Sequence, residues 1–175
     1  MRNFFIYIFI FFIAQNYVGR AQDMTNDDLE NIIYVVADSL RGDTGNWHFM
    51  ISNRILICIT DQNTNRMRIM SPIIKQNKIA RKDLKKMLQA NFHTALDVKY
   101  AIFEDVLWSV FMHPLKELSK DEVLSAINQV YSAAETYGTT FSSLEPIFSN
   151  KDIDMENKNR KIYYKLQILG FWGFG

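Results

Sequence analysis

The side chains that could do chemistry in this chain are few and scattered. Its three histidines, His48, His93 and His113, lie far apart in the sequence, and no two have the spacing of metal ligands. A zinc site needs three or four converging ligands, and Cys58 is the only thiol. Cys58 lies between two isoleucines, so we expect a small buried residue of a strand rather than a nucleophile. The sequence therefore predicts neither a metal site nor a cofactor.

Two further groups of polar residues have plain structural interpretations. Glu104 and Asp105 are adjacent, and adjacent side chains in a turn point apart, so a solvated hairpin turn is a better interpretation than a catalytic carboxylate pair. No glycine-rich phosphate loop, nucleophile elbow or zinc-helix motif occurs in the sequence. We therefore expect a protein that is not an enzyme.

Arg66 and Arg68 share one face of an expected strand with Met70. Guanidinium groups bind carboxylates bidentately, so this pair could hold an acidic partner. A solvated strand face, or an edge protected by charge, explains the same pattern. The sequence leaves these interpretations open.

The expected elements that position these residues alternate between helix and strand. A helix begins after Thr25, which is followed by Asp27 and Asp28, and its apolar spacing continues to Leu40. Two more helices are expected over residues 79–93 and from the capping box at 119–122 to Gly138. Strands are expected over residues 47–52, 55–60, 66–71, 97–103 and 106–113, with Pro72 ending the third. The order helix–three strands–helix–two strands–helix predicts an α+β domain with an antiparallel sheet covered by helices.

The strand expected over residues 106–113 is apolar on both faces. Trp108, Val110 and Met112 share one face, and Leu107 and Phe111 share the other. Such strands are usually central in a sheet or covered on both sides. We take Trp108, Val110 and Met112 as the candidate partner-binding surface, with Arg66 and Arg68 at its rim, and packing in the core as the alternative.

The first 21 residues have the composition of a secretory signal peptide. Arg2 is followed by an uninterrupted apolar run over residues 4–14, and Gly19-Arg20-Ala21 offers small residues at the cleavage site. This run is too short to cross a bilayer as a helix. We therefore expect cleavage after Ala21, no stable membrane anchor, and a mature protein in the periplasm or outside the cell.

The rest of the chain is the size of one domain, which we place at residues 22–149. The whole chain carries a charge of +1, and loss of Arg2 and Arg20 brings it to −1. That balance argues against nucleic acid or an anionic membrane as a standing partner. A single cysteine allows no intrachain disulfide, so packing must stabilise the domain. Residues 150–175 form a separate tail, in which a short helix over 162–169 precedes Phe171, Trp172 and Phe174.

The element order over residues 25–145, with the stretches Leu88–Phe92 and Asp105–Leu115, resembles a known superfamily. It is similar to the class I (CesT/Tir type) secretion chaperones of type III systems and to the bacterial sensory transduction regulator (YbjN-like) proteins. The resemblance implies a compact homodimer that binds an extended peptide or an unfolded segment of another protein, without chemistry.

The leading hypothesis is therefore an exported, non-catalytic, protein-binding homodimer. One alternative is a structural or assembly subunit of the cell envelope, which docks through the aromatic residues of its tail. The other is a small-ligand sensor with a pocket between sheet and helix.

Overall fold

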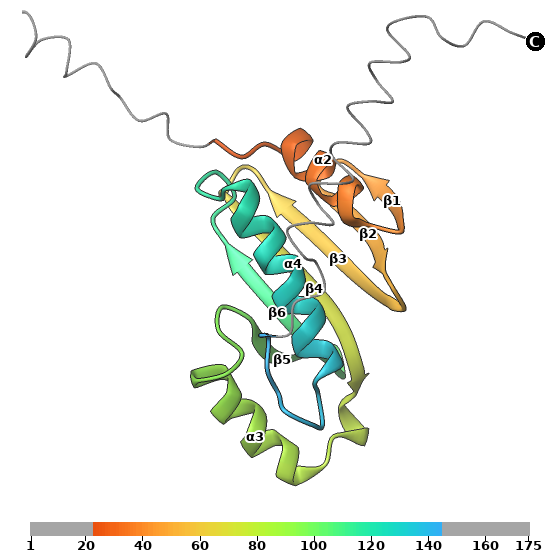
Figure 1. Ribbon diagram of the computed structural model, residues 1–175, viewed down its shortest axis with the longest axis vertical. Helices are drawn as coiled ribbons and strands as arrows, with labels where there is room; N and C mark the ends of the chain where they lie inside the picture. Colours follow the sequence, from red (N-terminus) through yellow and green to blue (C-terminus); the bar gives the residue numbers. More distant parts are fainter. Residues whose placement is uncertain (1–22, 145–175) are drawn as a thin grey trace, which may run out of the picture.

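The computed structural model describes residues 23–144, and in this part of the chain helices pack on a six-stranded antiparallel sheet (Figure 1). This confirms the expected α+β class. The predictions for the signal peptide and the tail, including Phe171, Trp172 and Phe174, lie outside the described residues, and the domain boundaries stay predictions. No helix within residues 23–144 is long and apolar enough to cross a membrane.

Helix α2 (Asn26–Val36) begins with a capping box in which Thr25 and Asp28 bond each other's backbone N–H groups. The expectation that this helix reaches Leu40 was wrong, because strand β1 (Ser39–Asp43) follows it. Local spacing favoured the helix, but the chain turns at Asp38, whose backbone N–H bonds to Met50 and whose carboxylate accepts the Ser52 N–H at 2.6 Å. Tertiary bonds to the second strand therefore decide where the helix ends.

The remaining strands are β2 (Asn46–Ile51), β3 (Arg54–Asp61), β4 (Arg66–Lys75), β5 (Lys99–Phe103) and β6 (Val106–His113). Their order in the sheet is β1-β2-β3-β4-β6-β5, with every neighbouring pair antiparallel. Strand β6 thus lies inside the sheet, as its two apolar faces indicated.

The expectation that Pro72 ends its strand was also wrong. Strand β4 continues to Lys75, and Pro72 lies opposite Trp108 of β6. A proline has no N–H to donate to the ladder, and the register shifts between Pro72 and Ile74, as at a β-bulge. The strand therefore continues through an irregularity instead of stopping.

The core lies between the sheet and helix α4 (Lys120–Glu135), which crosses β4 and β6 (Figure 1). Two bonds join the layers: Ser109 Oγ donates to the Val130 carbonyl at 2.9 Å, and Tyr100 Oη donates to that of Ala133 at 2.7 Å. Each fully buried large apolar side chain stabilises the domain by about 1.5–3 kcal/mol. The sheet residues buried on this inner face include Trp47, Phe49, Leu56, Met67, Ile69, Leu107 and Phe111.

Helix α3 (Arg81–Phe92) follows a short 3-10 turn (Gln76–Lys78) and lies beside the edge strand β5. The Asn91 side chain accepts the Tyr100 backbone N–H at 2.7 Å and donates to the Tyr100 carbonyl at 3.2 Å. Both backbone groups of one edge residue are therefore satisfied by the helix, which fixes α3 to the sheet.

Candidate functional site: the outer face of the sheet

The face of the sheet that points away from α4 is apolar over four strands. We call eight apolar residues of this face, on β2, β3, β4 and β6, the apolar outer face. None of them belongs to the core cluster or packs against it. The most exposed are Met112, at 59%, and Ile55 and Ile59, at 39% each. The eight residues are Met50, Ile55, Ile57, Ile59, Met70, Trp108, Val110 and Met112.

The strand register makes these side chains neighbours. Ile57 of β3 lies opposite Met70 of β4, which lies opposite Val110 of β6. One step along, Ile59 lies opposite Arg68, which lies opposite Met112. Cβ atoms of directly paired residues are about 4.5–5.5 Å apart, so the rows form one continuous surface.

The structure places the candidate partner-binding residues on this one face. Trp108 and Val110 are half-buried and Met112 is exposed, so none of the three is a core residue. Arg68 lies in the middle of the sheet beside Met112, and Arg66 lies opposite Asp61 at the start of β4. Their role in binding stays a prediction.

The contribution of β2 and β3 to this surface was not predicted from the sequence. Ile55, Ile57 and Ile59 alternate with buried residues of the inner face, so β3 is apolar on two sides, and Met50 is the apolar residue on the otherwise polar outer side of β2. The same signal had identified β6, and applied to residues 55–59 it would have found the three isoleucines. Met70 was noted beside Arg66 and Arg68, but only as part of that pair's surroundings.

The histidines, which could serve in chemistry, do not converge. His48 is exposed on β2, His93 ends α3, and His113 lies at the end of β6 with Nδ1 2.8 Å from the Pro114 carbonyl oxygen. Within the part of the chain that the structure describes, no three His, Cys, Asp or Glu residues could together hold a metal ion.

Cys58 and the two adjacent acids have the environments expected from the sequence. Cys58 is completely buried, and burial raises the pKa of its thiol, so the nucleophilic thiolate is disfavoured. Glu104 and Asp105 form the exposed two-residue turn between β5 and β6, with φ angles of 47° and 58°. Neither environment supplies a catalytic base or nucleophile.

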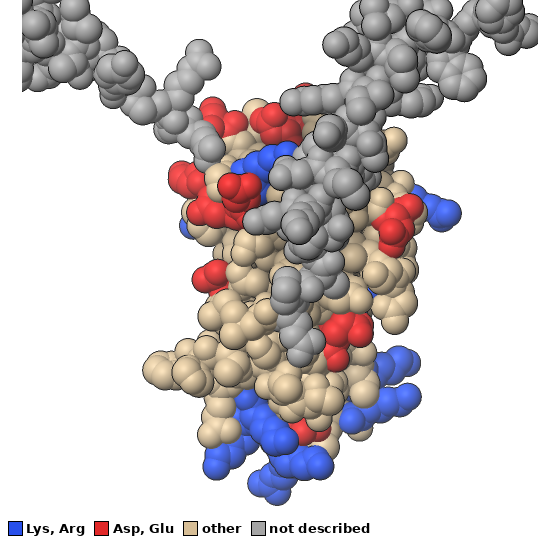
Figure 2. All heavy atoms as spheres, in the orientation of Figure 1, with Lys and Arg blue, Asp and Glu red and all other residues tan. Residues whose placement is uncertain are grey.

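Charge is separated between the two ends of the molecule, although the total is near zero. Figure 2 shows Lys and Arg gathered at the end that carries α3, and acids gathered near α2. The basic end comprises Lys75, Lys78, Arg81, Lys82, Lys85 and Lys86, and the acids at the start of α2 are Asp23, Asp27, Asp28 and Glu30.

Helix α3 also exposes an apolar stripe. Leu84, Leu88 and Phe92 recur every four residues and are 40%, 72% and 94% exposed. Residues at this spacing lie along one side of a helix. Three such residues in one row make this side of α3 a candidate surface for association.

Comparison with known proteins bears on the fold. No protein-family model and no curated protein matches the sequence. Among solved structures, the chain is similar to one in the HopA1–SchA chaperone–effector complex, with a TM-score of 0.50 and 13% identity over 62% of this chain and 88% of that one. A chain of the ExsC–ExsE complex matches with a TM-score of 0.48 and 11% identity over 69% of this chain and 98% of the other. The type III secretion chaperone-like fold expected from the sequence is confirmed.

Proposed function

We propose that this protein is a non-catalytic, chaperone-like protein that binds a polypeptide segment of another protein on its apolar outer face. The observation that carries the proposal is the position of those eight residues. They form a continuous surface on the side of the sheet opposite α4, outside the core cluster. When a partner covers the apolar second face of a sheet, the complex is stabilised, because apolar surface is removed from water.

The composition of the surface favours an extended, variable partner. Three of its eight residues, Met50, Met70 and Met112, are methionines, whose flexible side chains adapt to different partner shapes. Trp108 supplies a large rigid contact at one side, as aromatic residues do at interaction hot spots. Arg68, in the row of Ile59 and Met112, can pair with a carboxylate of the bound segment.

The comparison supports the class of function. The solved complex with the same fold is a chaperone–effector complex, so its fold accompanies protein binding there. This support is by analogy of fold, and the apolar outer face supplies the site.

The protein also forms a homodimer in this proposal, through the stripe on α3. The three apolar residues are evenly spaced about Leu88, so a two-fold axis through Leu88 sets Leu84 of one copy against Phe92 of the other. The lysines of one helix then lie near the C-terminal half of the second helix, where the dipole favours positive charge. Burial of the two Phe92 rings, each almost fully exposed in the single chain, stabilises this contact.

Export completes the proposal, and it rests on residues 1–21 alone. Expression of the full chain in a bacterial host, followed by intact mass measurement, tests it. We expect a product that begins at Gln22 and is found outside the cytoplasm. An uncleaved chain in the cytoplasm would contradict export.

Binding is tested with reduced, carboxymethylated α-lactalbumin, a permanently unfolded protein, as the probe. The test variant is Met112→Lys, and the matched control is Leu144→Lys, because Leu144 is similarly exposed, at 62%, and lies outside the sheet. We expect the test variant to weaken affinity at least tenfold and the control less than twofold. Equal affinities, or no binding to the native chain, would contradict the proposal.

A further inference from the structure

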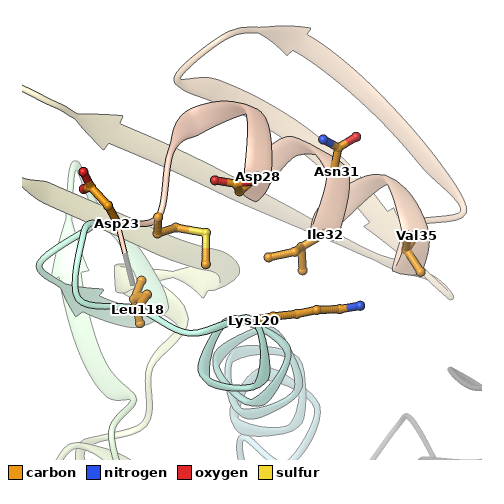
Figure 3. Close-up of a pocket in the computed structure, with 8 residues that line it drawn as sticks. Asp23, Asp28, Asn31, Ile32, Val35, Leu118 and Lys120 are labelled. Carbon is orange, nitrogen blue, oxygen red and sulfur yellow. The ribbon is translucent and has the colours of Figure 1, made fainter. Parts of the chain in front are cut away.

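A hollow of about 430 Å³ lies between α2 and the start of α4 (Figure 3). Its apolar lining consists of Met24, Ile32, Val35 and Leu118. Three of these side chains are at most 8% exposed, so they form a fixed floor. The volume lies in the range of surface sites that take up a bulky ligand group, which is about 300–1,000 Å³.

The rim of the hollow is acidic. Asp23 and Asp28 line it, with Lys120 as the basic residue among its lining residues (Figure 3). A second hollow of about 410 Å³ shares Asn31 with the first and is lined also by Asp27, Glu30 and Tyr34. The two hollows thus form one surface across α2, which we call the acidic groove. Four carboxylates stand there against one ammonium group, so the groove fits an apolar segment that is also basic.

The chain carries a segment of this composition outside the described residues. Residues 158–169 read Lys-Asn-Arg-Lys-Ile-Tyr-Tyr-Lys-Leu-Gln-Ile-Leu, with four basic residues and no acid. Six of the twelve are aliphatic or aromatic. The charge and the apolar content of this segment are complementary to those of the groove.

The segment can reach the groove within one chain. The described part of the chain ends at Leu144, next to the C-cap of α4, where Thr136 Oγ1 donates to the Ser142 carbonyl at 2.7 Å. The groove lies at the other end of α4, about 24 Å away for its 16 residues. The connecting residues 145–157 can span about 40 Å when extended, at ~3.3 Å per residue.

We propose that residues 158–169 dock intramolecularly in the acidic groove across α2, which includes the hollow between α2 and α4. The apolar side chains of the segment fill the hollow, and its lysines and arginine pair with Asp23, Asp27, Asp28 and Glu30. The aromatic end at residues 171–174 is then held beside the domain instead of in free solution. This docking is independent of partner binding on the apolar outer face.

Disulfide trapping in the full chain tests the docking. Buried Cys58 is unreactive, so any disulfide within the chain must form between the two introduced cysteines. The test pair is Asn31→Cys with Gln167→Cys, and the control pair is Gln89→Cys with Gln167→Cys. Gln89 is exposed on α3, which ends two residues before Thr94, and the Ser143 N–H bonds to the Thr94 carbonyl close to where the described part of the chain ends. A freely moving tail would therefore favour the control pair by proximity.

We expect the test pair to cross-link at least tenfold faster than the control, within single chains, and more slowly in 1 M salt. Glu30→Lys should slow it at least threefold, whereas Glu104→Lys, a charge reversal at the opposite end, should leave it unchanged. Equal rates for the two pairs would overturn the proposal. A disulfide that links two copies would also overturn it. So would binding of the tail to anionic phospholipid vesicles without cross-linking of Gln167→Cys to Asn31→Cys in the groove.

Discussion

The indole Nε1 of Trp108 donates a hydrogen bond to the backbone carbonyl of Phe103, at 3.2 Å. Phe103 ends β5 at the turn that leads into β6, so this bond fixes the tryptophan against its own hairpin. The ring is half-buried on the apolar outer face, whereas Trp47, on the inner face, is 1% exposed. Of these two tryptophans of one sheet, Trp108 therefore lies at a surface and Trp47 lies in the core.

Replacing each tryptophan by alanine should distinguish the surface position from the core position. Trp47→Ala opens a core cavity and should lower the free energy of unfolding by about 3–5 kcal/mol. Trp108→Ala removes one hydrogen bond and little packing, so we expect a loss of about 1 kcal/mol but at least tenfold weaker binding of unfolded α-lactalbumin. Urea unfolding and fluorescence anisotropy measure the two effects. If Trp108→Ala is as destabilising as Trp47→Ala, then Trp108 belongs to the core.

The α3 stripe should control the oligomeric state. Leu88→Asp or Phe92→Asp places a charge in the proposed contact, so we expect the dimer to dissociate into monomers. Gln89→Asp is the matched control, because Gln89 is exposed on the same helix and outside the stripe. Light-scattering mass measures the outcome. A native chain that is already monomeric at micromolar concentration would rule out this dimer.

Arg68 should set the preference for acidic partner segments. Because it lies between Ile59 and Met112 on the outer face, Arg68→Glu should repel a carboxylate-bearing segment and weaken its binding about tenfold at low salt. Arg41→Glu, on the same face at the edge strand β1, is the control and should change affinity less than twofold. The comparison uses one apolar peptide with and without aspartates. An unchanged preference for aspartates in Arg68→Glu would remove Arg68 from the binding surface.

The start of α4 should make stability depend on acid. The Ser119 backbone N–H donates to Glu122 Oε2 at 2.6 Å, and this bond lowers the pKa of the Glu122 carboxyl. A carboxyl whose pKa is lowered on folding stabilises the protein above its unfolded value, and that contribution is lost as the pH falls through the folded value. Glu122→Gln should therefore cost a few tenths of a kcal/mol at pH 7, and the difference from the native chain should vanish in acid.

Thermal unfolding between pH 2.5 and 7 measures this dependence, with Glu104→Gln in the solvated turn as the control. A difference between Glu122→Gln and the native chain that is the same at pH 2.5 as at pH 7 would show that the carboxylate is not the cause.

The sequence predicted much of this fold because its local signals agree with the tertiary structure. The capping box at Ser119 and the two-faced pattern of β6 both occupy the predicted places. It failed where tertiary bonds override local preference. Leu40 continues the helical spacing of the preceding residues, yet it joins the sheet in β1 because β2 offers backbone partners. Pro72 is a local stop signal that an irregular register accommodates.

The candidate site was predicted in part for a similar reason. Alternation identifies which residues of a strand share a face, and this placed Trp108, Val110 and Met112 together. Which strands lie beside β6 depends on the sheet order, and the pairing of β4 with β6 skips over α3 and β5 in the sequence. That Met50, Ile55 and Ile57 lie on the same surface as these three residues follows only from that order.

The central claim is that a polypeptide binds the apolar outer face, and methionine methyl NMR tests it most directly. Met50, Met70 and Met112 lie on that face, whereas Met67 and Met87 are buried at 1% and 4% exposure on the core side. On titration with unfolded α-lactalbumin, we predict that the methyl resonances of the first three shift and broaden, while those of Met67 and Met87 stay in place. Changes confined to Met24 or Met87, or no change at Met70 and Met112 on binding, would contradict the account.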